Sequence, residues 1–141
     1  MKTRAAMIFF ISLITFLMAC SAGKTTEKFP NGKYSFRSFT FLGEMVGDGS
    51  LYISKTDSVS FDGNWSIRDV KGCIVCGPQF GGGFLTGQIV GDSVYINLNP
   101  NNPENYVELL GKVDGENFSG DWRWFKLIVN SNRGTFEAIK E

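Results

Sequence analysis

Histidine is absent from this sequence of 141 residues, and its absence excludes several kinds of chemistry at once. Without an imidazole there is no histidine-activated nucleophile, no histidine-bound zinc and no side chain that ordinarily titrates near neutral pH. Catalysis would have to rest on carboxylates, lysine or tyrosine. The sequence therefore predicts a protein that is not an enzyme and that holds no metal and no other cofactor.

An excess of charge is also absent, because 14 basic residues balance 14 acidic ones. The basic residues stand singly along the chain, whereas a protein that binds nucleic acid gathers positive charge on one face. We therefore expect no nucleic-acid partner. A sustained apolar period of 3.6 residues is missing as well, which predicts a chain without a substantial helix.

Long apolar runs are scarce, and the one that is present stands at the start. Residues 1–4 carry two positive charges, and only Ser12 and Thr15 are polar within residues 5–19. A basic segment followed by a short apolar run is the layout of an export signal. The run is shorter than the roughly 20 residues of a membrane-spanning helix. We therefore predict a signal peptide at 1–19.

The segment Leu17-Met18-Ala19-Cys20 resembles the lipobox of bacterial lipoproteins, in which a leucine and a small residue precede an obligatory cysteine. The resemblance implies that a dedicated peptidase cuts before Cys20, whose sulfur then carries a diacyl group with chains such as palmitate. A further acyl group on the new N-terminus would complete the two signals that stable anchoring requires. We therefore expect a bacterial cell-envelope location, at the outer membrane or facing the periplasm, with the membrane as a partner through Cys20. An ordinary secretory signal with an incidental cysteine stays open.

The part of the chain from Cys20 onward divides into a tether and one domain. Residues 20–30 are mostly small and polar, which is typical of a flexible tether. Pro30-Asn31-Gly32 is a turn signal, and residues 31–141 are enough for a single domain with its own core. Short apolar runs separated by Gly, Asn and Asp predict that this domain consists of β-strands.

Alternation with a period of two is clearest in the second half of the chain. Val94, Ile96 and Leu98 share one face of a strand, while the residues between them share the other. Asp114-Gly115 favours a tight hairpin turn. Nearly every connection is of hairpin length, so we predict an all-β, antiparallel up-and-down barrel of about eight strands. The strand candidates lie at 33–42, 50–54, 58–61, 65–70, 84–90, 93–98, 106–113, 118–124 and 134–139.

The first half of the chain is less regular. Glycine with neighbouring acidic and amide residues predicts turns at 43–49 and 62–64. Within the first strand candidate, Tyr34 and Phe39 lie on opposite parities. Either a bulge near Arg37-Ser38 shifts the phase, or both faces of this strand are partly buried.

A short pattern occurs twice, as Phe61-Asp62-Gly63-Asn64-Trp65 and as Phe118-Ser119-Gly120-Asp121-Trp122. Each copy places glycine two residues before tryptophan. In this the chain resembles the calycin barrels, the lipocalins and avidin-like proteins, in which Gly-x-Trp stands on a strand and the tryptophan plugs one end of the core. Lipocalins carry the motif on their first strand, whereas these copies fall later. Residues 133–138 also look like the closing strand of small bacterial barrels of this kind, and the resemblance implies a barrel that holds a small apolar molecule.

Aromatic side chains are the candidates for such a ligand site. The candidate ligand-binding residues are Trp65, Phe84, Phe118, Trp122 and Trp124. If Trp122 and Trp124 face inward, they line a cavity or simply fill it, because side chains alone nearly fill an eight-stranded barrel. The glycines at 81–83 are either a mobile connection or part of a lid whose apolar lips are Phe80 and Phe84.

Cys73-Ile74-Val75-Cys76 is the most conspicuous local feature. A zinc site would need about four ligands, and the chain offers no histidine and no second cysteine pair. A thioredoxin-like redox pair would sit at a helix N-terminus within a βαβ pattern, which is missing here. We predict a structural disulfide between Cys73 and Cys76, with a free or redox-active pair as the alternative.

Two weaker features concern partners and chemistry. Tyr52, Tyr95 and Tyr106 fall on outward parities, where they either form an exposed aromatic strip for a partner or a glycan, or are exposed singly. The only catalytic candidates are isolated carboxylates, whereas a glycosidase needs two acids that face each other across a cleft. These candidates are Glu44, Asp48, Asp121 and Glu137.

The anchor and the barrel lead us to expect a cell-envelope lipoprotein that binds a small apolar ligand or a protein partner non-covalently. A solid core without a cavity near Trp122 and Trp124 would favour the protein partner. The alternatives are a lipoprotein that inhibits an enzyme and a carboxylate-based hydrolase that acts on envelope glycans.

Overall fold

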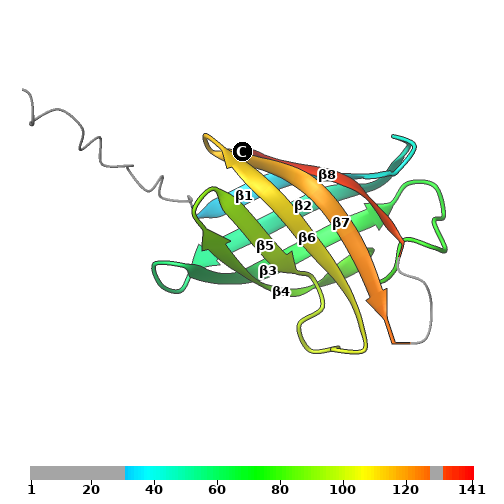
Figure 1. The fold of residues 1–141 in the computed structure, drawn as a ribbon. Helices are drawn as coiled ribbons and strands as arrows, with labels where there is room; N and C mark the ends of the chain where they lie inside the picture. The colour runs from blue at the N-terminus through cyan, green and yellow to red at the C-terminus, as the bar shows by residue number, and fades with distance from the viewer. Residues whose placement is uncertain (1–30, 128–131) are drawn as a thin grey trace, which may run out of the picture.

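A computed structural model describes residues 31–127 and 132–141 of the chain. The strands are β1 (Gly32–Thr40), β2 (Met45–Lys55), β3 (Ser60–Asp69), β4 (Gly81–Val90), β5 (Ser93–Asn97), β6 (Asn105–Asp114), β7 (Asn117–Lys126) and β8 (Arg133–Lys140). Each strand pairs antiparallel with the next, and β8 pairs with β1, so the sheet closes into a barrel (Figure 1). The predicted all-β up-and-down barrel is therefore confirmed.

The predicted signal peptide, Cys20 and the tether up to residue 30 lie outside the described residues. Every ladder of the barrel falls within residues 32–140, so a protein that begins at Ser21 contains the whole sheet. No helix in the described part of the chain is long and apolar enough to cross a membrane.

Alternation along the strands places one face of each strand inside the barrel. In β5, Val94 and Ile96 are buried, whereas Ser93, Tyr95 and Asn97 between and beside them are partly exposed. The inward positions of the eight strands supply a single core. Its largest fully buried side chains are Trp122, Tyr34, Phe36, Phe118, Leu51 and Ile67.

The two turns predicted from glycine in the first half are wrong in their placement. Residues 62–64 lie inside β3, which unites two strand candidates, and residues 45–49 lie inside β2. At Gly63 a Cβ would collide with the backbone carbonyl of Tyr52 on the neighbouring strand, and Gly49 meets a similar obstacle. Glycine at these positions permits a close approach of two backbones.

The bulge at this position belongs to β2. The register of β1 against β2 shifts between Ser38 and Phe39, where Val46 of β2 is the extra residue. Along β1 the phase does not shift, because Tyr34, Phe36 and Ser38 are all buried and the register against β8 is unbroken. A bulge within β1 was therefore predicted on the wrong strand, and the alternative holds in part, since Phe39 on the other face is partly buried. Phe41, beyond the end of the strand, is exposed.

The two ends of the barrel differ in their connections (Figure 1). The connections after β1, β3, β5 and β7 lie at one end, which we call the loop end, and the longest of them spans residues 70–80. The opposite end, the turn end, holds the connections after β2, β4 and β6. The start of β1 and the end of β8 also lie at the turn end. The barrel is therefore joined to the preceding chain at the end opposite its long loops.

Candidate functional site

Buried aromatic rings pack together with aliphatic side chains in the interior of the barrel. Phe118 and Trp122, two of the predicted ligand residues, are 2% and 0% exposed. The ring of Phe118 packs edge-on against Tyr34, with centroids 5.1 Å apart. It also packs against Phe136 at 6.0 Å, and Phe136 in turn stacks on Phe36 at 5.8 Å. Side chains thus occupy the space in which a small apolar ligand was expected.

Trp65 and Trp122 share one arrangement, which relates the two copies of the sequence pattern. Each tryptophan faces a glycine on the next strand, and the missing side chain leaves room for the indole ring. Trp65 Nε1 donates to the backbone carbonyl of Leu98 at 2.6 Å. Trp122 Nε1 donates to that of Phe39 at 2.8 Å. Both carbonyls lie towards the loop end, so each tryptophan ties the core to that end.

Trp124 lies half-buried beneath the 70–80 connection. Its Nε1 donates to Asn105 Oδ1 at 2.7 Å. Its ring lies against Gly77, where a Cβ would collide with it and where a φ of 69° favours glycine. Trp124 therefore supports the connection above it, and a ligand-binding role for the tryptophans and Phe118 stays a prediction.

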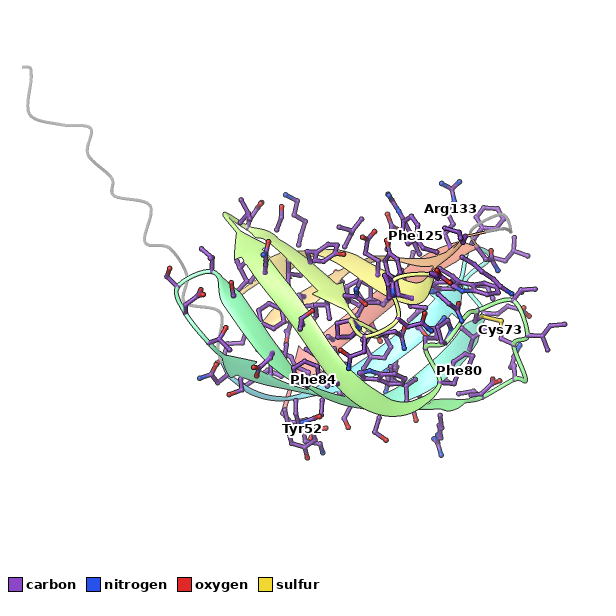
Figure 2. The ribbon with its side chains drawn as sticks, turned by 90° about the horizontal axis from the view of Figure 1, so that it is seen from below. Tyr52, Cys73, Phe80, Phe84, Phe125 and Arg133 are labelled. Carbon is purple, nitrogen blue, oxygen red and sulfur yellow. A yellow bond between two sulfur atoms is a disulfide. The ribbon has the colours of Figure 1, made fainter. Side chains whose placement is uncertain are left out.

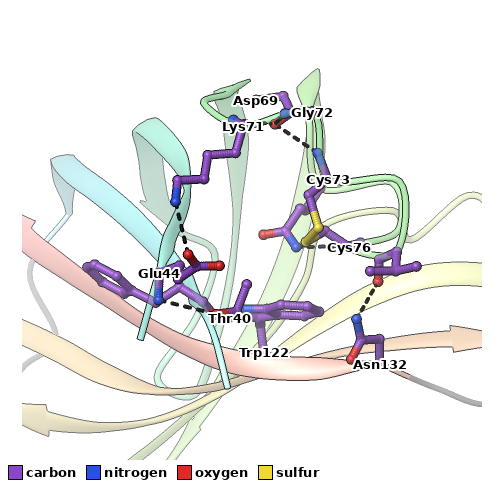
Figure 3. The surroundings of a disulfide bond; sticks show 12 residues. Thr40, Glu44, Asp69, Lys71, Gly72, Cys73, Cys76, Trp122 and Asn132 are labelled. Carbon is purple, nitrogen blue, oxygen red and sulfur yellow. Dashed lines mark hydrogen bonds and ion pairs between the residues drawn. A yellow bond between two sulfur atoms is a disulfide. The ribbon is translucent and has the colours of Figure 1, made fainter. Parts of the chain in front are cut away.

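Cys73 and Cys76 form a disulfide bond in this connection, as predicted (Figure 3). Cys76 is fully buried against the core, whereas Cys73 is partly exposed. Asp69, the last residue of β3, precedes this connection. Asp69 Oδ1 accepts hydrogen bonds from the backbone N–H groups of Lys71, Gly72 and Cys73 at 3.0, 2.7 and 3.2 Å. Burial opposes the charged carboxylate, but these bonds outweigh burial and lower the pKa of Asp69.

Two contacts join the 70–80 connection to its neighbours at the loop end (Figure 3). Asn132 Nδ2 donates to the backbone carbonyl of Val75 at 2.7 Å. Lys71 Nζ pairs with Glu44 Oε1, on the connection after β1, at 3.2 Å. Beneath them Gln79 is fully buried and donates to a carbonyl of the disulfide loop at 2.8 Å. We call the 70–80 connection and these contacts the cap. The sequence did not identify Gln79 as part of the cap, because glutamine is ordinarily exposed.

Large apolar side chains are exposed on these same connections. We call them the apolar crown: Phe41, Leu42, Val70, Ile74, Val75 and Leu127. Ile74 is 92% exposed and Leu42 is 77% exposed. At the turn end, Val59 is exposed on the connection after β2 and Val90 is exposed at the end of β4. Single exposed apolar residues are ordinary, but a group on one surface indicates an interaction site.

Phe84 lies outside the barrel. Its side chain points outward from β4 and is 44% exposed. In the sheet it pairs with Asn64 of β3, which pairs with Tyr52 of β2, so the three lie in one row on the outer face (Figure 2). Phe84 therefore lies on the opposite face of the wall from Phe118 and Trp122, which are buried in the core.

Two hollows flank Phe84 along β4. The first has a volume of about 360 Å³ and extends towards the turn end, where Asp62, Thr86, Gln88 and Tyr95 line it. Hydroxyl and amide groups and aromatic rings therefore line this part of the wall together. The one carboxylate in its described lining is Asp62, whereas glycoside hydrolysis uses two.

The second hollow has a volume of about 230 Å³ and lies towards the loop end. Gly82 and Gly83 form one side of it, and residues 98–102 of the connection after β5 form the other. Trp65 contributes to its lining, so this hollow brings together two predicted ligand residues, Trp65 and Phe84. We call Phe84 and its two hollows the β4 groove. The contribution of Asn99-Pro100-Asn101-Asn102 was missed, although such a polar run is a recognisable loop signal.

The three tyrosines predicted to face outward lie on different strands, β2, β5 and β6. Tyr52 is 52% exposed, whereas Tyr95 and Tyr106 are partly buried. Tyr106 stacks on Phe125 with centroids 5.1 Å apart. Burial, and then a hydrogen bond with Glu108, raises the pKa of Tyr95 to about 12. These three side chains form no single strip, and Tyr95 belongs to the β4 groove.

The predicted candidate carboxylates come from different elements: Glu44 from the connection after β1, Asp48 from β2, Asp121 from β7 and Glu137 from β8. In the sheet register Asp48 and Glu137 flank Arg37. Three of them form exposed ion pairs: Glu44 with Lys71 at 3.2 Å, Asp48 with Arg68 at 2.7 Å and Glu137 with Arg37 at 3.3 Å. Hydrogen bonding and charge from Lys112 lower the pKa of Asp92, as backbone bonds lower that of Asp69. A catalytic acid needs the opposite shift. Among the described residues, no cluster of three or more His, Cys, Asp or Glu suits a metal ion.

Comparisons with known proteins assign no family to this chain. No protein-family model matches it, and neither does any curated protein. One solved structure, described as a de novo design of a fluorescence-activating β-barrel, has a TM-score of 0.49 and 10% sequence identity. That likeness covers 82% of this chain and 97% of the designed one. At this level the likeness carries no argument about function.

Proposed function

We propose that this protein is a non-enzymatic lipoprotein of the bacterial cell envelope that binds a protein partner through the apolar crown. The observation that carries the proposal is the exposure of large apolar side chains on three joined connections of the loop end. Burying one such side chain contributes about 1.5–3 kcal/mol. A few well-buried residues provide most of the affinity of a protein interface. The crown therefore has the composition that a modest but specific interface needs.

The packed interior supports a partner outside the barrel over a small apolar ligand inside it. Phe118 and Trp122 are buried against other rings, and the N–H of Trp122 is already bound to a backbone carbonyl. A ligand at this place would have to displace those contacts. Native packing of this kind resists such a change.

The direction of the crown supports a partner other than the anchoring membrane. On the lipoprotein prediction, Cys20 is joined to the barrel through the start of β1, which lies at the turn end. The crown lies at the opposite end and would face away from the lipid. The Glu44–Lys71 pair beside the crown is neutral as a unit and gives it a polar rim, which is typical of protein interfaces.

Three tagged versions of the full chain test the proposal: the wild type, Ile74→Asp and Val90→Asp. The two substituted side chains are 92% and 73% exposed, at the loop end and the turn end respectively. We expect a host envelope protein that the wild type and Val90→Asp both retain and that Ile74→Asp loses. A carboxylate placed in an apolar interface should weaken it more than tenfold, because burying an unpaired charge is costly.

Thermal melting should first establish that all three versions fold alike. Quantitative mass spectrometry of the retained proteins then compares them. Equal retention by all three versions would contradict the proposal. Loss from both substituted versions would contradict it too, because the effect would then not depend on the loop end.

A further inference from the structure

We infer that the β4 groove is a binding site for a neutral saccharide, which stacks on Phe84 and forms hydrogen bonds with the amides and hydroxyls on either side. This inference concerns the barrel wall and is independent of the protein partner proposed for the crown. It rests on an opening in the sheet, on the exposed ring and on the chemistry of the lining.

The opening arises because β5 is short. It pairs with Thr86 to Val90 only, so residues 81–85 of β4 have β3 on one side and the connection after β5 on the other. Among the described residues, no backbone hydrogen bond joins residues 81–85 to residues 98–102. The hollow of about 230 Å³ occupies this interval. The barrel wall therefore has an unpaired edge that a ligand can reach.

Glycine keeps this edge accessible. Gly82 and Gly83 are exposed, and Gly82 is on the outward parity next to Phe84. A Cβ at Gly82 would lie 3.2 Å from the backbone oxygen of Trp65, and a longer side chain would project into the hollow that Gly82 lines. A Cβ at Gly83 would press on the indole of Trp65, at 3.1 Å from Nε1. The run of glycines thus serves the packing of Trp65 on one face and leaves room for a ligand on the other.

Phe84 supplies the stacking surface. Phenylalanine has no polar group that would favour an exposed position, yet this ring is 44% exposed between two hollows. The larger hollow, of about 360 Å³, lies near the lower end of the roughly 300–1,000 Å³ range of ligand sites, and the smaller one, of about 230 Å³, lies below that range. A sugar ring presents C–H groups on its faces and hydroxyls at its edge. It therefore suits an aromatic ring that has polar neighbours on both sides.

The lining determines the charge of the ligand. Thr86, Gln88 and Asn101 offer hydroxyl and amide groups that both donate and accept hydrogen bonds. The described lining contains no basic residue, which disfavours an anionic ligand, and its single carboxylate is Asp62. An extended peptide also suits an unpaired strand edge. Such a peptide needs pockets for alternate side chains, and here asparagine and proline line the loop side.

Titration of nitrogen-15-labelled protein, from Ser21 onward, with separate hexasaccharides tests the inference by NMR. The neutral probes are cellohexaose, xylohexaose and the hexamer of N-acetylglucosamine, and the anionic probe is a hyaluronan hexasaccharide. A neutral hexapeptide of alternating Thr and Val represents the peptide. We expect at least one neutral saccharide to shift the amide signals of residues 82–84 and 98–102, and to leave that of Ile74 unchanged.

Substitutions at the exposed ring complete the test. Phe84→Ala should weaken saccharide binding roughly tenfold, whereas Phe84→Trp should retain it. Phe41→Ala is the matched control. It removes the same kind of ring from a more exposed position in the crown, and it should leave saccharide binding unchanged. The inference is overturned if no neutral probe shifts the groove signals at millimolar concentration, if only hyaluronan or only the peptide does so, or if Phe84→Ala binds as well as the wild type.

Discussion

The loop end and the turn end of this barrel are built from the same eight strands, yet different forces determine them. At the turn end, two hairpin turns depend on the local backbone: Gly91 and Gly115 have φ values of 64° and 61° and meet no neighbouring atom at the position of a Cβ. Hydrogen bonds such as that from the N–H of Val113 to the carbonyl of Asp92 then join neighbouring turns. The loop end depends on distant residues, since Asn132 and Trp124 both hold the 70–80 connection. Local turns close the barrel, whereas the long-range contacts of the other end position an exposed apolar surface.

Among the substitutions that compare the two ends, removal of Trp122 should have the largest effect on stability. The Trp122 side chain joins the core to the loop end. Trp122→Ala should lower the free energy of unfolding by about 3–5 kcal/mol, since it leaves a cavity and an unpaired carbonyl at Phe39. Trp124→Ala, which removes a half-buried ring, should cost clearly less. Urea unfolding measures both. Equal losses would show that the two rings contribute alike and would contradict the distinction between core and cap.

Two glycines with similar backbone conformations compare the ends directly. Gly77→Ala and Gly115→Ala both place a side chain at positive φ, which costs about 1–2 kcal/mol. At Gly115 nothing opposes the new methyl group, whereas at Gly77 it meets the ring of Trp124. Gly77→Ala should therefore destabilise the barrel by about 1–3 kcal/mol more, as overpacking does. Identical urea midpoints for the two variants would contradict this account of the loop end.

Loss of the disulfide should have a smaller and more local effect. The double substitution Cys73→Ala and Cys76→Ala should cost about 1–2 kcal/mol, because a ring of so few residues constrains the unfolded chain little. Amide hydrogen exchange should accelerate in residues 70–80. Exchange around Gly115 should stay at the wild-type rate. Acceleration at both ends would show that the disulfide stabilises the whole barrel instead of the cap.

Acid should reveal the smallest difference. The pKa values of Asp69 and Asp92 are both lowered in the folded protein, so their ionised forms stabilise the fold above the usual value of 3.8. That contribution is lost as the pH falls below 3.8 through the lowered values. Asp69→Asn and Asp92→Asn should each lose less stability on acidification than the wild type does. The measurement is the fall in the urea midpoint between about pH 6 and about pH 2, for the wild type and for each variant. If both variants lost as much stability on acidification as the wild type, the stabilising role of these two carboxylates would be contradicted.

The sequence was sufficient for the fold because the period of two is a local signal. The alternation of Val94 and Ile96 with polar neighbours indicates a strand without reference to any distant residue. Asp114-Gly115 correctly predicted the turn between β6 and β7. Gly63 misled the prediction because glycine serves both turns and close backbone approach, and only the neighbouring strand distinguishes them. The Cys73–Cys76 disulfide was predicted because the chain lacks the further ligands of a zinc site and the βαβ pattern of a thioredoxin-like pair, together with the expectation of export.

The candidate site was predicted only in part. Trp65 and Phe84 were named together and do line one hollow, but its other side comes from residues 98–102, which no pattern connected to them. The crown was missed, although Phe41 and Ile74 stand in connections where a large apolar side chain has no strand to pack on. Exposure of such residues depends on how the connections fold over the barrel. That information lies in tertiary contacts and not in local sequence.

Direct contact at the crown tests the central claim, that the loop end is the interface for a protein partner. A photoreactive amino acid is introduced in place of Ile74, and separately in place of Val90 at the turn end, in the full chain in living cells. After irradiation, we expect a discrete cross-linked protein from position 74 and none of the same mass from position 90. Cross-links of the same mass from both positions, or from position 90 alone, would contradict it.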